Sequence, residues 1–390
     1  MSKKNIIFKN FSLKNKSINQ IKDLKKIFKG LLKEENQILN SLKKNYKNSY
    51  SKKLVLRLRK NDKFNLIGMG GSILGARAIY DFMKPRPKKF FFIDSFSNNI
   101  KKEKPYKKII NIVISKSGNT LETISNVNTL IDKKNTNIFL TENKKSYLMN
   151  IANKLKSEIV YHNNYIGGRY SVLSEVGMLP AMLMGLDVKK FRSLNELIKK
   201  KSFMKSLINN VSNILSLMKK NKFNSVILNY DEKSEDLFYW YQQLVAESLG
   251  KKGSGILPIV SKMPQDNHSL MQSYLDGTKN NFYTFFFVKN NSNNNIKNNK
   301  LLETHKYLRN KSLGNILYDQ CIATQNVFKK KKIPFRSFYI KKRNEESLGE
   351  LFTFFMLETI LLGKALKVNP YDQPSVELIK IETKKRLLKN

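Results

Sequence analysis

Residues 240–277 combine a carboxylate and an imidazole within one short stretch of chain. Gln243 and Glu247 are four residues apart in a run with helical spacing, so they share one face of a predicted helix. The glycines of LGKKGSG then predict the end of that helix, and His268 follows in a polar loop. A carboxylate on a helix and an imidazole on a nearby loop are two groups able to transfer protons. Taken alone, each residue is more simply explained as a solvated surface group, because Glu is a common helix former.

A glycine-rich turn, GMGGSILG at 68–75, follows the apolar run FNLI and precedes a helical stretch. This order exposes backbone N–H groups at a helix N-terminus, where they can bind an anion. Asp94 stands about where a ribose-binding acid would fall, so a dinucleotide site has to be considered. That fingerprint needs G-x-G-x-x-G, and Ile73 occupies the third glycine position, which argues against NAD. A turn that uses glycines only for its geometry is the remaining alternative.

Hydroxyl groups gather in a second window, ISKSGNTLET at 114–123, directly after the apolar run IINIVI. Ser115, Ser117 and Thr120 lie at the start of a predicted helix, whose dipole attracts negative charge. An N-cap would use the same residue types and needs no ligand. The sequence alone leaves these two interpretations open.

Two further windows contain residues that could bind an anion or orient a substrate. Arg169, within IGGRYSVLSEVGMLPAMLMGLD at 166–187, follows two glycines and precedes a helix, and its planar group suits an oxyanion or a phosphate. A surface arginine in a turn is the simpler alternative. The last window, NPYDQPSVELIK at 369–380, contains Gln373 and Lys380.

In this order along the chain, the windows resemble those of phosphoglucose isomerases, a family with the sugar isomerase (SIS) fold. The resemblance runs from roughly residue 63 to residue 380. The window 114–123 is richer in serine than the threonine-rich loop typical of the family. Ser375 and Ile379 stand where the closing signature of the family has glycines.

The resemblance implies an aldose–ketose isomerase that converts glucose 6-phosphate and fructose 6-phosphate through a cis-enediolate, with no cofactor and no metal. It implies that Glu247 is the proton-transfer base, that Arg169 stabilises the enediolate, and that His268 and Lys380 open the sugar ring. The implied phosphate- and substrate-binding residues are Gly71, Ser72, Ser115, Lys116, Ser117, Thr120, Gln243 and Gln373. It further implies a homodimer in which the neighbouring subunit supplies His268.

Two alternatives remain open within this resemblance. A bifunctional phosphoglucose/phosphomannose isomerase shares the fold, and the loop SKSGNT is slightly more similar to the loop of that enzyme class. A non-catalytic SIS-type regulator that binds a sugar phosphate would need the phosphate loop alone. The joint presence of Glu247, Arg169 and His268 favours the enzyme.

Composition limits the other classes of function. The chain has 390 residues, 41% of them hydrophobic, and a net charge of +43 from 73 Lys+Arg against 30 Asp+Glu. The lysines are spread along the whole chain together with Asn, Ile and Phe, whose codons are A/T-rich, so base composition explains the charge without a dedicated nucleic-acid function. The single cysteine, Cys321, excludes an intrachain disulfide, and the three histidines lie far apart. No long apolar run or signal peptide is present, so we expect a cytoplasmic protein with no membrane partner.

Helical stretches alternate with short apolar runs at 64–68, 89–94, 109–115, 136–141 and 158–162 and again in the second half of the chain, which predicts an α/β fold with parallel sheets covered on both faces. Together with this pattern, the resemblance implies two doubly wound, parallel-sheet SIS-type lobes. Residues 1–60 are expected to form an N-terminal helical segment. Residues 61–200 form the first predicted domain, and residues 201–390 form the second together with a C-terminal helix. The Asn- and Lys-rich stretch 289–300 is expected to be a surface loop.

Overall fold

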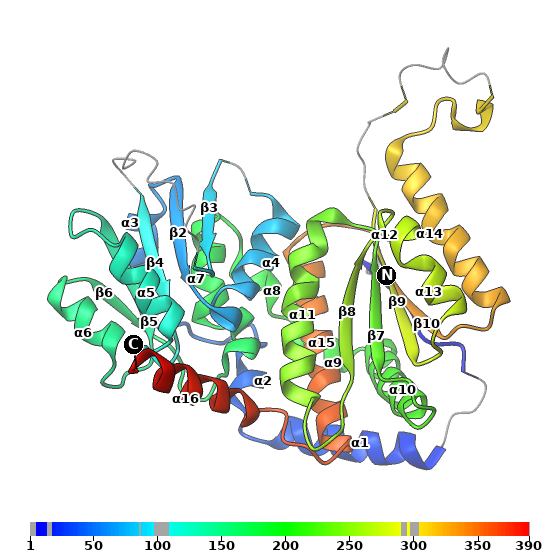
Figure 1. Cartoon of the computed structure of the whole chain (residues 1–390), viewed down its shortest axis with the longest axis horizontal. Helices are drawn as coiled ribbons and strands as arrows, with labels where there is room; N and C mark the ends of the chain where they lie inside the picture. Colours follow the sequence, from blue (N-terminus) through cyan, green and yellow to red (C-terminus); the bar gives the residue numbers. More distant parts are fainter. Residues whose placement is uncertain are drawn as a thin grey trace.

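The computed structural model describes residues 5–13, 18–85, 87–96, 109–289, 295–296 and 304–389. Two α/β lobes lie side by side, with helix α11 (Glu235–Leu249) between their sheets (Figure 1). The predicted fold class is therefore confirmed. The predicted surface loop 289–300 falls mostly outside the described residues.

The first lobe contains a five-stranded parallel sheet in the order β3-β2-β4-β5-β6. Its strands are β2 (Lys63–Gly68), β3 (Lys89–Ile93), β4 (Ile110–Ile114), β5 (Thr136–Thr141) and β6 (Glu158–Tyr161), all at predicted positions. Every residue of the central strand β4 is buried, as expected for a parallel sheet covered on both faces. The helices of this lobe are α4 (Leu74–Met83), α5 (Leu121–Leu130), α6 (Tyr147–Lys154) and α7 (Glu175–Leu183).

The second lobe has a mixed sheet in the order β1-β10-β9-β7-β8. Its strands are β7 (Asn224–Asn229), β8 (Leu257–Lys262), β9 (Asn281–Val288), β10 (Phe335–Ile340) and the N-terminal β1 (Ile6–Lys9). Its helices are α10 (Lys201–Met218), α11, α12 (Asp266–Ser269), α13 (Met271–Asp276), α14 (Leu313–Lys330) and α15 (Glu345–Ala365). Strand β1 pairs antiparallel with β10, whereas the other pairings are parallel.

The N-terminal helical segment differs from its prediction in two ways. It includes strand β1, and its long helical pattern is divided into α1 (Ile18–Lys33), α2 (Gln37–Ser41) and α3 (Lys52–Leu58). The break before α2 has a local cause, because the Asn36 side chain accepts hydrogen bonds from the N–H groups of Ile38 and Leu39. Short helices α8 (Val188–Phe191) and α9 (Leu194–Lys199) then connect the first lobe to α10.

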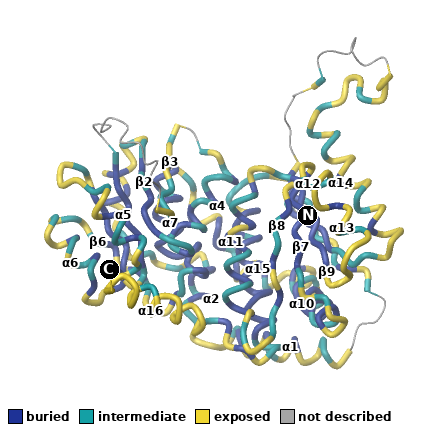
Figure 2. The backbone as a smooth tube through the Cα atoms, in the orientation of Figure 1, coloured by how far each residue is buried: buried dark blue, intermediate teal, exposed yellow. Residues whose placement is uncertain are grey.

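One hydrophobic core extends through both lobes and joins them. Helix α11 packs against α4 of the first lobe and against α15 of the second, and its Leu244 and Leu249 are buried. Figure 2 shows α11 as mostly buried or half-buried. Gln243 and Glu247 of the same helix are half-buried and contact residues of the first lobe. The C-terminal helix α16 (Ser375–Leu387) is different, because none of its residues is buried. No described helix is long and apolar enough to cross a membrane.

Candidate active site

The strand order of the first lobe places two loops at one edge of its sheet. From β2 the chain goes to β3 on one side, and then returns to β4 on the other side. The loops that follow β2 and β4 therefore meet at a topological switch point, where α/β proteins bind ligands. These are the windows 68–75 and 114–123.

Glycines in the first of these loops permit close packing against the rest of the site. Gly70 has φ +54°, and a Cβ there would lie 2.9 Å from Nε2 of Gln243 on α11. A Cβ on Gly71 would lie 2.2 Å from the carbonyl carbon of Gly168, so two backbones are in direct contact. This contact brings the loop after β2 against the 3₁₀ helix η2 (Gly168–Leu173), which contains Arg169.

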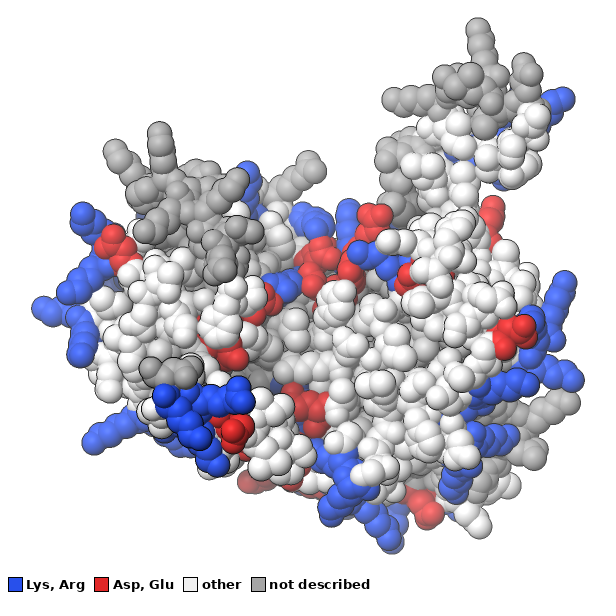
Figure 3. Space-filling model, in the orientation of Figure 1, with Lys and Arg blue, Asp and Glu red and all other residues white. Residues whose placement is uncertain are grey.

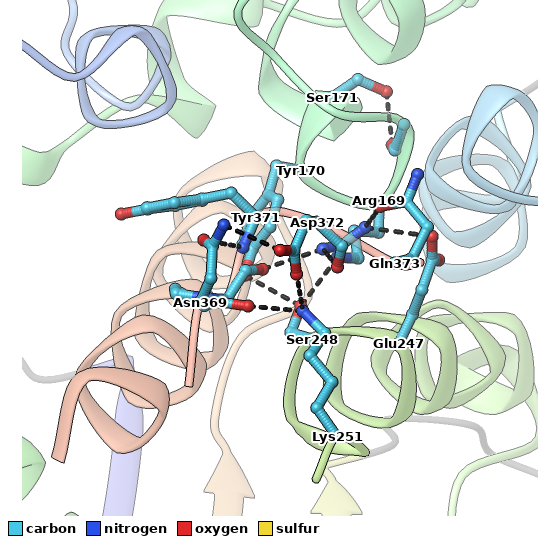
Figure 4. Close-up of polar contacts among 12 residues, drawn as sticks. Arg169, Tyr170, Ser171, Glu247, Ser248, Lys251, Asn369, Tyr371, Asp372 and Gln373 are labelled. Atoms are coloured by element: carbon cyan, nitrogen blue, oxygen red, sulfur yellow. Dashed lines mark hydrogen bonds and ion pairs between the residues drawn. The ribbon is translucent and has the colours of Figure 1, made fainter. Parts of the chain in front are cut away.

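Arg169 is the centre of the site (Figure 4). Its side chain is 2% exposed and uses all five of its N–H donors, at 2.7–3.0 Å. The five acceptors are Ser248 Oγ, Glu247 Oε1, Gln373 Oε1 and the carbonyl oxygens of Pro370 and Asp372. The guanidinium is thus a fixed positive charge with no donor left over. It is not the surface arginine of the alternative interpretation.

Glu247 differs from its partner because its side chain is 23% exposed. Its Oε1 accepts from Arg169 Nη1 at 3.0 Å, and no described residue donates to Oε2. One carboxylate oxygen is therefore held and the other is open. This geometry suits a base that takes up and returns a proton.

Segment 369–373 completes the wall opposite α11. The Lys251 ammonium lies 2.7 Å from Asp372 Oδ1, and Asn369 donates to Oδ2 of the same carboxylate at 3.0 Å. The hydrogen bond from Lys251 lowers the pKa of Asp372. Tyr170 donates to the carbonyl of Pro370 at 3.0 Å, and burial raises the pKa of its hydroxyl to about 12. Sequence analysis missed Lys251, Tyr170 and Ser248 as parts of this site.

The family model for phosphoglucose isomerase matches residues 58–263, which is more than half of the chain. The chain belongs to the phosphoglucose isomerase family. Glucose-6-phosphate isomerase from Methanocaldococcus jannaschii is 33% identical over 80% of this chain and 81% of that protein. Glucose-6-phosphate isomerase from Mycoplasmopsis synoviae is 31% identical over 81% of this chain and 80% of that protein.

Solved structures show the same fold. A hypothetical protein from Thermus thermophilus superimposes with a TM-score of 0.79 at 23% identity, over 95% of each chain. A glucose-6-phosphate isomerase from Chlamydia trachomatis gives a TM-score of 0.68 at 18% identity, over 90% of this chain and 77% of that one.

In this member of the phosphoglucose isomerase family, the serine-rich loop places its hydroxyl groups at the start of α5. Ser115 Oγ lies 2.9 Å from Thr120 Oγ1, and Ser117 Oγ accepts from the N–H of Asn119 at 3.2 Å. Thr120 is the N-cap residue of α5, but its side chain makes no capping hydrogen bond. Its hydroxyl is therefore not used as the N-cap interpretation requires. A helix start with a hydroxyl group that does not cap the helix is suited to bind a phosphate.

Lys116 lies in the same loop, but its ammonium is directed elsewhere. Its Nζ lies 3.3 Å from Oε1 of Glu142, while its carbonyl oxygen accepts from the N–H of Glu142 at 3.1 Å. An anion at this loop would therefore meet the backbone of Lys116 more directly than its charge. Ser72 lies at the end of η1 (Gly70–Ser72), on the neighbouring loop.

Two predicted catalytic residues are not brought to this cluster within one chain. His268 is exposed on the short helix α12 of the second lobe. Lys380 is exposed on α16, where its Nζ lies 2.6 Å from Oε1 of Glu377, one helical turn away. No hydrogen bond or ion pair among the described residues joins either side chain to Arg169 or Glu247.

Charge around the site agrees with the dispersed pattern of the sequence. On the face drawn in Figure 3, Lys and Arg lie mainly around the rim of the molecule and form no single continuous patch. Among the described residues, no group of three or more His, Cys, Asp or Glu side chains is placed to hold a metal ion.

Proposed function

We propose that this chain catalyses the reversible isomerisation of glucose 6-phosphate and fructose 6-phosphate through a cis-enediolate. The observation that carries the proposal is the Glu247 carboxylate, which Arg169 holds by one oxygen while the other stays open, on a helix whose Gln243 faces the loop after β2. In this mechanism Glu247 takes the C2 proton of the open-chain aldose and returns it to C1. One carboxylate is sufficient because it can reach C1 and C2 of the planar cis-enediolate from the same face.

Arg169 supplies electrostatic stabilisation in this scheme. Its five donors are already used, so it acts on the enediolate oxygen through its charge and not through a new hydrogen bond. Gln243 and Gln373 would orient the sugar, because Gln243 lies one turn before Glu247 on α11 and Gln373 accepts from the same Arg169 nitrogen as Glu247. Oε1 of Gln243 is buried and has no partner among the described residues, which leaves an acceptor for a substrate hydroxyl.

The phosphate group would bind at the switch point. We assign it to backbone N–H groups of both loops and to their hydroxyl groups, and Lys116 contributes chiefly through its backbone. The residues of this assignment are Gly71, Ser72, Ser115, Lys116, Ser117 and Thr120. No cofactor takes part in the scheme. We place the enzyme in the cytoplasm, because a negatively charged sugar phosphate does not cross a membrane freely and is retained there.

We assign ring opening to His268 and Lys380, with proton exchange at the O1 hydroxyl and the ring oxygen. Because His268 is remote from Glu247 in one chain, this assignment includes a homodimer in which a second copy supplies His268. Mixing His268→Asn and Glu247→Gln proteins tests it, since one site of each mixed dimer would carry both intact residues. Recovery of activity on mixing is expected, and no recovery would show that His268 does not act across subunits.

A coupled assay with fructose 6-phosphate on the purified chain tests the main proposal. We expect turnover, together with exchange of the C2 proton of glucose 6-phosphate with solvent deuterium. Turnover of mannose 6-phosphate at a comparable rate would favour the bifunctional isomerase instead. Binding of fructose 6-phosphate without turnover or exchange would favour the regulator and overturn the enzyme.

A further inference from the structure

A buried histidine–glutamate pair lies at the two ends of the segment that contains Arg169 and plays no part in the scheme above. His162 follows β6, and Glu175 is the first residue of α7. Their side chains are 1% and 3% exposed, and His162 Nδ1 lies 3.7 Å from Glu175 Oε2. Neither atom has a hydrogen-bond partner among the described residues. Buried polar atoms in this state need an explanation.

The hydrogen bonds around the pair determine where its protons lie. His162 Nε2 is 2.9 Å from the carbonyl oxygen of Ile166, which can only accept, so Nε2 carries a hydrogen. A neutral ring would then turn the bare lone pair of Nδ1 toward a carboxylate oxygen, an arrangement with two buried acceptors facing each other. The contact between Nδ1 and Oε2 is favourable only when a proton lies between the two atoms.

The surroundings of Glu175 favour the charged form. Its Oε1 accepts from the Tyr46 hydroxyl at 2.9 Å and from the N–H of Ser49 at 3.3 Å. Burial by itself raises the pKa of Glu175, but the interactions with His162 and Tyr46 outweigh it, and the pKa lies below its ordinary value. The other titratable or charged side chains near the pair are Tyr50, Arg192, Lys43 and Lys47.

The chain between the two residues contains Arg169. Gly167 and Gly168 immediately precede Arg169, so the backbone there has no side chain to restrict it. Inside the segment, Gly168 packs against Gly71 and Arg169 is held by its hydrogen bonds, and two further contacts hold the ends of the segment. His162 holds the carbonyl of the fully buried Ile166, and Glu175 anchors the start of α7.

We infer that His162 and Glu175 are positioning residues, which together hold segment 166–174 so that Arg169 meets Glu247 and segment 369–373. The inference rests on the proposed function for its kinetic readout. The pair touches neither Glu247 nor the phosphate loop, so it acts through Arg169. A displacement of that guanidinium would misplace the base and the Gln373 amide together.

Glu175→Ala removes the contact between Glu175 and His162, and Glu175→Gln is the conservative substitution. Gln keeps the acceptor for Tyr46, and its amide N–H can donate to a neutral His162 Nδ1. We expect Glu175→Ala to lower kcat by about tenfold to a hundredfold with KM changed by less than about twofold, as for a small misplacement of a catalytic group. Glu175→Gln should recover most of that loss. Glu158→Ala is the matched control, because Glu158 is an exposed acid of β6 that pairs with Arg57.

Coupling to Arg169 separates positioning from a general structural role. In an Arg169→Lys background, Glu175→Ala should lower kcat no further, because the group it positions is gone. The inference would be overturned if Glu175→Ala lowered kcat by the same factor in both backgrounds. It would also be overturned if the kcat of Glu175→Ala equalled that of Glu158→Ala. The kcat of His162→Gln is measured in parallel in both backgrounds. If Glu175→Ala does not fold, the same comparison with His162→Gln tests the inference.

Hydrogen exchange gives a readout that needs no activity. Amides of residues 166–174 should exchange faster in Glu175→Ala than in Glu158→Ala, while those of β2 and β4 stay unchanged. If the wild-type chain does not isomerise fructose 6-phosphate, the proposed function fails and this exchange pattern still decides the role of the pair. If it does isomerise the sugar and both exchange and kcat match the control, only the positioning inference fails.

Discussion

Each lobe contains a buried arginine paired with a glutamate, and the two pairs have different consequences. In the second lobe, Arg336 Nη1 lies 2.8 Å from Glu358 Oε2, and the two side chains are 0% and 2% exposed. In the first, Arg169 is as deeply buried, but Glu247 is 23% exposed. The ion pair is thus common to both regions, and the open carboxylate oxygen occurs in only one.

The partners of the two arginines show what each pair connects. Arg336 also binds Thr284, Asn210 and Tyr241, all in the second lobe, so its network ties a sheet to its own helices. Arg169 joins the first lobe to α11 and to segment 369–373. A buried arginine that crosses between lobes can hold a reactive group at their boundary. One that stays inside a lobe contributes to the structure of that lobe.

Glu247→Gln should give the largest effect and tests the reactive side of this comparison. Gln keeps the shape and the bond to Arg169 but cannot take a proton, so kcat should fall by about 10²–10⁴-fold. A sugar-phosphate inhibitor should still bind with wild-type affinity. Glu235→Gln is the control, because Glu235 is an acid at the start of the same helix that pairs with Lys262. Near-normal turnover of Glu247→Gln would assign the proton transfer to another residue.

Glu358→Gln tests the structural side. It leaves the Arg336 charge buried without its counter-ion, so the free energy of unfolding should fall by about 3 kcal/mol, the lower end for such a change because Gln still accepts a hydrogen bond. Urea denaturation measures the loss, and kcat per folded molecule should be unchanged. The double variant Arg336→Met/Glu358→Leu should be more stable than Glu358→Gln alone. A large loss of kcat in folded Glu358→Gln would break the distinction between the two pairs.

Replacing two hydroxyl groups of the loop 114–123 should have a smaller effect, which we expect on substrate binding. The double variant Ser117→Ala/Thr120→Ala removes two donors at the start of α5, so KM for fructose 6-phosphate should rise about tenfold. Inhibition by 6-phosphogluconate should weaken in parallel. Ser125→Ala is the control, because Ser125 is a half-buried serine of α5 whose hydroxyl donates to the carbonyl of Leu121. Unchanged constants in the double variant would remove this loop from the site.

Asp236, at the start of α11, should show the smallest effect. This carboxylate forms no ion pair with a described residue, and burial, with smaller contributions from its neighbours, raises its pKa to about 6. Because the folded chain then binds this proton more tightly than the unfolded chain, stability should fall as pH rises from about 4 to about 6 and stay lower above that window. Asp236→Asn should remove this slope and stabilise the protein at pH 7 by about 1 kcal/mol, since solvent screens part of the effect. Thermal unfolding across that pH range measures it, and an unchanged slope would contradict the assignment.

Local sequence patterns were enough to predict much of the fold. All five strands of the first lobe and helix α11 fall where apolar runs and helical spacing indicate. Strand β8 was not predicted, because Pro258 interrupts its pattern, and the structure places it at a sheet edge where proline is tolerated. Strand β1 was missed because its pairing with β10 depends on residues more than 300 positions away.

The site was predictable in its residue types but not in its connections. The partners of Arg169 lie 78 to 204 positions further along the chain. No local pattern shows that Ser248 or the carbonyl of Pro370 accepts a hydrogen bond from it. Motif resemblance supplied Glu247 and Arg169 as a pair, and the hydrogen bond between them agrees with it. The roles of His268 and Lys380 remain predictions, because a single chain does not bring these side chains to the cluster.

The bonds between Arg169 and segment 369–373 have a consequence for how the protein is made. This segment follows every strand of both lobes in the chain, and synthesis proceeds from the N-terminus. On the ribosome, both sheets can therefore form while two carbonyl groups and one amide that surround the arginine have not yet emerged. A nascent chain halted before residue 369 would lack three of the five acceptors that surround the Arg169 guanidinium.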